Sequence, residues 1–164
     1  MNFNLGPHHT LIEKSTSWNF NEDGDAAQLE NDMIEFMLAS NGIGLAANQI
    51  GIAKRVFVMG SNNINGFPAP FAVFNPVIKE TSQEQVLDRE GCLSYPGLFL
   101  TVKRPAWAVA EYQDRDGNLK EIKVDGYLAK CFQHEYDHLD GICFVDRVSQ
   151  MKLNLAMKKI RKMK

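Results

Sequence analysis

The first clear hydrophobic pattern of the chain predicts an α-helix over residues 25–41. Positions three and four apart share one face of a helix. The positions that share this face are Leu29, Met33, Phe36, Met37 and Ser40. Gly42 follows directly and predicts the C-terminus of the helix, because glycine adopts the left-handed conformation that often ends a helix.

Further along, short runs rich in β-branched and aromatic residues predict strands. These runs cover residues 55–59, 71–74, 107–112 and 119–124. Asp116-Gly117 lies between the last two runs and is typical of a hairpin turn. The segment 60–70 is rich in Asn, Gly and Pro, which predicts a surface loop.

A second amphipathic pattern predicts a helix that begins near Asp125-Gly126. It places Tyr127, Cys131, His134 and His138 on one face, which we expect to be buried. A last helix is predicted over residues 150–162. The sequence therefore predicts an α+β fold with an N-terminal helix, antiparallel strands packed around the histidine-bearing helix, and a short C-terminal helix. A length of 164 residues predicts one domain, residues 1–164.

Composition excludes several classes of protein. Hydrophobic residues make up 45% and charged residues 23%, which is ordinary for a soluble globular domain. No apolar run approaches the roughly 20 residues that span a bilayer, so no membrane segment is expected. A formal net charge of −2 and an isoelectric point near 6.1 argue against a nucleic-acid-binding protein. Three cysteines, an odd number, and no recognisable targeting segment predict free thiols and a cytoplasmic location.

The most informative motif is His134-Glu135-Tyr136-Asp137-His138, an H-E-x-x-H sequence on the second predicted helix. Two imidazoles one turn apart can ligate one tetrahedral cation, and Glu135 between them can reach a water molecule on that cation. Such a cation lowers the pKa of its water from about 15.7 to about 7. The alternative interpretation is that the two histidines fall four apart by chance and that Glu135 is merely exposed.

A catalytic site of this kind needs a third ligand, and the downstream sequence does not offer one. The extended protease motif would place a histidine where the chain has Phe144, and no glutamate follows Glu135. Asp140 and Cys143 follow the motif too closely to fold back, and Asp146 is typical of a solvated turn. The third ligand is therefore expected upstream.

Upstream, the best candidate is Cys92 in the segment 90–94, EGCLS. A thiolate is a strong ligand for a borderline-soft divalent cation, and Gly91 lets the backbone approach a metal or a substrate closely. The alternative is that Cys92 is a buried structural thiol. Cys131 and Cys143 are interpreted as small buried hydrophobic residues, with Cys131 on the wall of the site.

Three blocks of the sequence resemble the peptide deformylase family. They are residues 42–49 (GIGLAANQ), 90–94 (EGCLS) and 133–139 (QHEYDHL), in the family's order and with similar spacing. Weaker matches extend the resemblance to Arg147. The first forty residues are the least typical part, and the segment after the last helix is very short.

The resemblance implies removal of the formyl group from N-formylmethionyl peptides, which gives formate and a free N-terminus. Cys92, His134 and His138 would hold one divalent metal ion, Fe²⁺ under physiological conditions. From the ligands alone, Zn²⁺, Ni²⁺ or Co²⁺ would be suitable as well. Glu135 would take a proton from water and deliver it to the departing amine.

Residues of the other two blocks are candidates for stabilising the reaction and binding the substrate. The Gln49 amide could donate a hydrogen bond to the developing oxyanion, and the resemblance implies the Leu93 backbone N–H as its partner. Gly42 and Gly44 do not indicate a dinucleotide loop, because the third glycine is missing. We expect the methionine side chain to lie among Ile43, Tyr127, Cys131 and the His134 ring, although Ile43 and Tyr127 would suit ordinary core packing equally. The peptide backbone would pair with the Gly44 and Gly91 segments.

Two other functions remain possible from the sequence. One is a different H-E-x-x-H amidase or peptidase, which would cleave unformylated peptides or acetylated amines. The other is a metal-binding module without turnover, which would need neither Glu135 nor Gln49.

The C-terminal helix is strongly basic, and no acidic residue follows Asp146. The basic residues from position 147 to the end of the chain are Arg147, Lys152, Lys158, Lys159, Arg161, Lys162 and Lys164. We expect Leu153, Met157, Ile160 and Met163 to face inward. The basic face could simply favour the negative end of the helix dipole, at about 0.3–1 kcal/mol per residue. It could also dock on ribosomal RNA, which the resemblance supports in part. The protein is expected to be a monomer.

Overall fold

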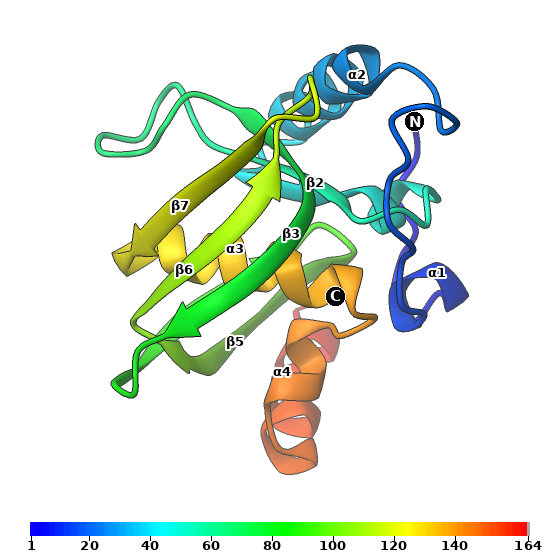
Figure 1. The fold of residues 1–164 in the computed structure, drawn as a ribbon. Helices are drawn as coiled ribbons and strands as arrows, with labels where there is room; N and C mark the ends of the chain where they lie inside the picture. Colours follow the sequence, from blue (N-terminus) through cyan, green and yellow to red (C-terminus); the bar gives the residue numbers. More distant parts are fainter. Residues whose placement is uncertain (164) are drawn as a thin grey trace.

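A computed structural model describes residues 1–163 as a five-stranded antiparallel sheet, a separate two-stranded hairpin and four helices (Figure 1). The order of the larger sheet is β1-β2-β3-β6-β7. Its strands are β1 (Gly44–Ala46), β2 (Val56–Met59), β3 (Phe71–Thr81), β6 (Trp107–Gln113) and β7 (Leu119–Asp125). The hairpin consists of β4 (Gln85–Cys92) and β5 (Tyr95–Pro105). The helices are α1 (His9–Ile12), α2 (Ala26–Ala39), α3 (Gly126–Leu139) and α4 (Gln150–Lys162), with 3₁₀ turns η1 (Ala47–Ile50) and η2 (Phe144–Arg147).

Strand β2 is buried on both faces because α2 and α3 cover opposite sides of this part of the sheet. Phe57 and Met59 belong to the hydrophobic cluster that contains Phe132 of α3. Val56 and Val58 belong to the cluster formed with α2. Successive strand residues point to opposite faces, so a strand between two helices is apolar throughout. The larger sheet is thus a platform that fixes α3 on one side.

Helix α2 confirms the first predicted helix, but its C-terminal signal lies one residue earlier than expected. Asp25 caps the N-terminus by accepting a hydrogen bond from the Gln28 N–H. The left-handed residue at the other end is Asn41, with φ 57°, so the assignment of this role to Gly42 was wrong. A Cβ at Gly42 would lie 2.9 Å from the Leu93 side chain, so a larger residue there would displace Leu93.

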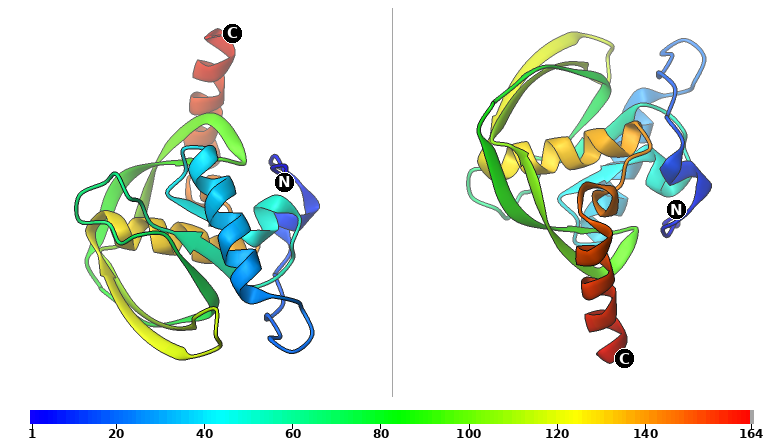
Figure 2. Two further views of the ribbon diagram at one scale, coloured as in Figure 1. Left: turned by 90° about the horizontal axis from the view of Figure 1, so that it is seen from above. Right: turned by 90° about the horizontal axis from the view of Figure 1, so that it is seen from below.

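Helix α3 begins where the sequence predicts and is largely buried over its second half. The five-stranded sheet covers one side of this helix and the β4–β5 hairpin approaches another, as the views in Figures 1 and 2 show. The helix face predicted to be buried carries Tyr127, Cys131, His134 and His138. The prediction is confirmed for Cys131, His134 and His138 but wrong for Tyr127, which is 46% exposed. Tyr127 lies in the first turn, where its ring contacts Phe67 of a surface loop rather than the core.

The hairpin β4–β5 was not predicted from the sequence, and neither was the short α1. Two inward positions of the hairpin carry the buried charged residues Glu90 and Arg104 instead of hydrophobic ones. Charges at inward positions remove the hydrophobic alternation by which a strand is recognised. Strand β3 is also longer than predicted, because polar residues follow Phe74 and the pairing with β6 contains register shifts.

Helix α4 has the predicted bounds and projects from the body of the molecule (Figure 2). Its inward residues are Leu153, Ala156 and Ile160, which contact the apolar side of the hairpin. The prediction that Met157 and Met163 face inward was wrong, since they are 37% and 86% exposed. The predicted basic residue Lys164 lies outside the described residues.

The remaining sequence predictions for strands 55–59, 107–112 and 119–124 and for the loop 60–70 are confirmed. Within residues 1–163, no helix combines the length and the apolar character needed to cross a membrane.

Candidate active site

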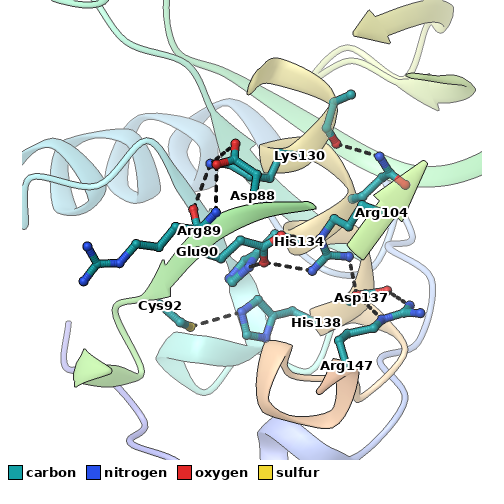
Figure 3. Close-up of polar contacts among 12 residues, drawn as sticks. Asp88, Arg89, Glu90, Cys92, Arg104, Lys130, His134, Asp137, His138 and Arg147 are labelled. Carbon is teal, nitrogen blue, oxygen red and sulfur yellow. Dashed lines mark hydrogen bonds and ion pairs between the residues drawn. The ribbon is translucent and has the colours of Figure 1, made fainter. Parts of the chain in front are cut away.

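The three residues predicted as metal ligands meet between the hairpin and α3 (Figure 3). Cys92 is the last residue of β4, and His134 and His138 lie one turn apart on α3. Their ligand atoms all lie within 4.8 Å of one another, and Cys92 Sγ is 3.4 Å from His138 Nε2. Segments far apart in the sequence therefore present one sulfur and two imidazole nitrogens to a common point.

The turn of the hairpin determines where Cys92 lies. Leu93 and Ser94 form the two-residue turn between β4 and β5, and the strand pairing shifts register between Gly91 and Cys92. A Cβ at Gly91 would lie 2.7 Å from the Phe99 ring. A larger residue at position 91 would therefore push the exposed Phe99 ring aside, next to the candidate ligand Cys92.

Glu90 orients the first histidine. Its Oε2 lies 2.9 Å from His134 Nδ1, so the other ring nitrogen is left free to ligate a metal. Burial alone would raise the pKa of Glu90, but the hydrogen bonds from His134 and Arg104 hold it at about 2. Burial would lower the pKa of His134, whereas its contacts with Cys92 and Glu90 raise it to about 10. A metal ion bound by His134 would replace the proton on the ring nitrogen that does not face Glu90.

Arg104 joins this region into a buried ionic network (Figure 3). Its guanidinium donates to both oxygens of Glu90, at 2.5 and 3.0 Å, and to Asp137 Oδ2 at 2.8 Å. Arg147 of η2 donates to the same Asp137 carboxylate from the other side. Sequence reasoning gave no role to Glu90, Arg104 or Asp137. The only available signal was their position inside or beside the matching blocks.

Glu135 lies on the same helix with its carboxylate beneath β1. A Cβ on Gly44 would overlap that carboxylate, so only glycine fits at this position of β1. Among the described residues, Glu135 Oε2 is buried and has no hydrogen-bond partner. Burial raises the pKa of Glu135 to about 7, although the positive charges of His134 and Arg104 act in the opposite direction. The carboxyl group is thus held in a dry position with one oxygen available.

Gln49 lies in η1 and its amide is fixed in one orientation. The Ala46 N–H donates to Gln49 Oε1 at 2.9 Å. The amide nitrogen therefore points the other way, 3.1 Å from Ser94 Oγ and 3.6 Å from Cys92 Sγ. The donor end of Gln49 is directed at the hairpin turn that contains Leu93.

These residues surround one cavity of about 590 Å³. All of the site residues predicted from the sequence line it except His138. They are Ile43, Gly44, Gln49, Gly91, Cys92, Leu93, Tyr127, Cys131, His134 and Glu135. Cys143, which was expected to be structural, is buried with its sulfur 3.9 Å from the Leu11 carbonyl oxygen.

The donor set fits a divalent cation. One thiolate and two imidazoles are the ligands of open tetrahedral sites, which keep a fourth position for water or substrate. The unpartnered oxygen of Glu135 and the oriented ring of His134 are the supporting features that such a site requires.

Comparison with known proteins identifies the family. The sequence profile described as "Polypeptide deformylase" matches residues 2–154. The chain belongs to the polypeptide deformylase family. A peptide deformylase of Wolbachia pipientis wMel is 43% identical, over 98% of this chain and 93% of that protein.

Solved structures of deformylases agree with the fold. A peptide deformylase from Ehrlichia chaffeensis, in complex with actinonin, superposes with a TM-score of 0.87 at 37% identity, covering 100% of this chain and 97% of that one. A peptide deformylase from Synechococcus elongatus, also with actinonin, gives a TM-score of 0.87 at 35% identity, covering 97% of this chain and 85% of that one.

Membership of the family establishes the general activity. This chain is a metal-dependent hydrolase that removes the formyl group from the N-terminal formylmethionine of newly made polypeptides and releases formate. The two other functions considered from the sequence, a different amidase and a module without turnover, find no support in these comparisons.

The geometry predicts which variants lose metal. Cys92→Ser, His134→Ala and His138→Ala should each lose tightly bound metal, because each removes one of three converging donors. Cys131→Ser and Cys143→Ser should remain fully loaded. Elemental analysis of the five purified proteins tests this, and a metal-free Cys131→Ser protein beside a fully loaded Cys92→Ser protein would contradict the assignment.

Proposed function

We propose that deformylation takes place in the cavity described above, with specific residues in specific roles. The residues proposed to hold the metal are Cys92, His134 and His138, and those proposed to act on the substrate are Glu135, Gln49 and the Leu93 N–H. A divalent cation held there supplies Lewis acidity and makes a water molecule nucleophilic near neutral pH. The observation that carries the proposal is that the donor set, the buried carboxylate and the fixed amide all line or adjoin a single cavity.

Glu135 is proposed to move the proton. It takes a proton from the attacking water and later delivers it to the departing amine, acting as base and then as acid. Its position supports this role, because its free oxygen is buried beside the ligands and Gly44 leaves room for the carboxylate. Removal of water from this pocket strengthens the electrostatic interactions that the carboxylate makes.

Gln49 and Leu93 are proposed to stabilise the oxyanion that forms on the formyl oxygen. The Ala46 N–H already holds the amide of Gln49, so little reorganisation is needed when charge develops. Leu93 lies in the turn opposite, and its N–H would be the second donor. Loss of one such donor in other enzymes costs about 10²–10³ in rate.

The substrate is proposed to bind as an extended strand with its methionine side chain in the cavity. Strand β1 is an edge of the larger sheet, and β4 pairs only with β5. Their backbones at Gly44 and Gly91 are therefore available to an added strand. Ile43, Tyr127 and Cys131, with the His134 ring, would then surround the thioether side chain.

Fe²⁺ is proposed as the physiological metal, although the same donors suit Zn²⁺, Ni²⁺ and Co²⁺. The decisive experiment is formate release from formyl-Met-Ala-Ser by protein loaded anaerobically with Fe²⁺ or, as an air-stable substitute, with Ni²⁺. We expect turnover with the formyl substrate and none with acetyl-Met-Ala-Ser. Cleavage of the acetyl substrate but not the formyl one would contradict the proposed function.

The role of Glu135 can be tested separately from metal binding. Glu135→Gln should keep a metal content near that of the wild type while turnover falls by about 10²-fold or more, because an amide cannot transfer the proton. Formate release and elemental analysis on the same preparation measure both quantities. Retention of more than about a tenth of wild-type activity would show that Glu135 is not the acid–base group.

We also propose that the chain contacts the ribosome through α4. The helix projects from the body (Figure 2). Lys158 and Lys162 are exposed on it, together with Met151 and Leu155. Contacts between such lysines and RNA phosphates are strong at low salt and weaken steeply as salt rises. Docking there would bring the enzyme to nascent chains as they emerge.

The ribosome proposal predicts a loss of binding when the outer charges are reversed. Lys158→Glu with Lys162→Glu, and protein truncated after Ser149, should pellet less with ribosomes than the full chain does at low salt. The wild-type signal should fall steeply at moderate salt. The double variant leaves the inward Leu153 and Ile160 unchanged, so its deformylase activity on a free peptide is the control. Equal pelleting of all forms would leave α4 with a purely structural role.

The proposed site of action is the cytoplasm, and the proposed active form is the monomer. The three cysteines are all free, which suits a reducing compartment. A single chain supplies every candidate site residue and one continuous cavity, so a second copy is not needed to complete the site.

A further inference from the structure

A second, smaller cavity lies beside the proposed substrate cavity. It has a volume of about 170 Å³ and lies between the hairpin and the first turns of α3. Its lining combines the apolar residues Val86, Val102, Pro105 and Ala106 with the charged residues Asp88, Glu90, Arg104 and Lys130. Glu90, Tyr127 and Lys130 line both cavities, so they form the wall between them. Catalysis as described above makes no use of this second space.

Lys130 is held firmly in that wall. Its Nζ donates to Asp88 Oδ2 at 2.9 Å and to the Arg89 carbonyl oxygen at 3.0 Å (Figure 3). It also lies 3.9 Å from the centre of the Tyr127 ring, within the range of a cation–π interaction. Only 14% of the Lys130 side chain is exposed, which is low for a lysine near the surface. Two of these contacts join α3 to β4, and the third holds the ammonium group against Tyr127 of its own helix.

The remaining part of the lysine side chain is apolar and suits a partition. The methylene groups of a lysine pack against apolar surfaces while the charge is satisfied elsewhere. A substrate side chain that extended past Tyr127 would have to displace this chain. Displacement would break the contacts of Nζ with Asp88 Oδ2, with the Arg89 carbonyl oxygen and with the Tyr127 ring. A side chain that stops short of the wall would meet no such cost.

We infer that Lys130, anchored by Asp88, determines specificity by limiting the length of the first substrate side chain. The inference rests on the proposed binding of the methionine side chain among Ile43, Tyr127 and Cys131. The partition confines that side chain to the larger cavity and keeps the smaller cavity closed to it. Loss of the partition joins the two spaces and admits longer linear side chains.

A purely structural role for the bridge gives a different expectation. If Lys130 only fastened α3 to the hairpin, its loss would lower stability or activity toward every substrate alike. A partition instead changes the ratio of activities between substrates of different length. The ratio of kcat/KM values is therefore the informative quantity, because it reports differential binding of the transition states.

The experiment compares formyl-Met-Ala-Ser with formyl-2-aminooctanoyl-Ala-Ser, whose first side chain is two atoms longer. In Lys130→Ala, kcat/KM for the longer substrate relative to the methionine substrate should rise about tenfold or more, since each methylene accepted by an apolar pocket is worth about tenfold or more. Asp88→Ala removes the anchor from a more exposed position and should raise the ratio in the same direction. Lys79→Ala is the matched control, because Lys79 pairs with Glu111 on the larger sheet, away from both cavities.

A ratio within about twofold of the wild-type value in Asp88→Ala and in Lys130→Ala, with normal metal content, would overturn the inference. If Lys130→Ala does not fold, Asp88→Ala alone decides. Failure of the proposed function would look different, because the wild-type protein itself would then release no formate from formyl-Met-Ala-Ser.

Discussion

The buried guanidinium of Arg104 is the interaction on which the arrangement of the site depends. Among residues 1–163, the β4–β5 hairpin shares no strand pairing with the five-stranded sheet, so its position on α3 depends on side-chain contacts as well as on its short connections to β3 and β6. Arg104 binds Glu90 of its partner strand and Asp137 of the helix, and all three side chains are almost fully buried. Removal of one partner from a buried network of this kind costs about 3–5 kcal/mol, because the other charges lose their compensation. The network therefore fixes the distance between the hairpin, which carries Cys92, and the helix, which carries both histidines.

The same network reaches the chemistry through Glu90. One oxygen of this carboxylate is shared between Arg104 and His134, so the residue that holds the hairpin also orients a proposed metal ligand. On the other side of the cavity, the larger sheet positions Glu135 and Gln49. Gly44 of β1 leaves space for the Glu135 carboxylate, and the turn after β1 holds Gln49. The site is thus built where two separately supported sheets meet one helix.

The sequence predicted the elements whose hydrophobic residues are the ones buried in the structure. Strand β2 and helices α2 and α3 bury apolar residues at the expected periods, so each was predicted close to its observed bounds. The hairpin could not be predicted in this way, because Glu90 and Arg104 occupy inward positions where a hydrophobic residue is expected. Local patterns commonly fail at functional positions for this reason. The inward face of α4 was predicted incorrectly at Met157, because the helix turns Leu153, Ala156 and Ile160 toward the hairpin and leaves Met157 exposed at the edge of that face.

The sequence predicted the candidate metal ligands, whose side-chain chemistry and spacing are informative, but not the residues that position them. The spacing of His134 and His138 and the absence of a downstream ligand were sufficient to indicate Cys92. The residues that position these proposed ligands, Arg104 and Asp137, have no signal beyond their place inside or beside the matching blocks, because their importance arises from contacts between distant segments. The partition formed by Lys130 has no local signal either, since a lysine on a helix is usually exposed to solvent.

The affinity of the Arg104→Met variant for its metal tests the account most directly. Methionine keeps much of the side-chain length but leaves Glu90 and Asp137 without their common partner. Competition with a chromophoric chelator gives the dissociation constant, with Lys103→Met on the opposite face of β5 as the control. The account predicts that metal binding by Arg104→Met weakens about 10–100-fold while the control is unchanged. A dissociation constant within about twofold of the wild-type value would contradict the claim that this buried network sets the metal site.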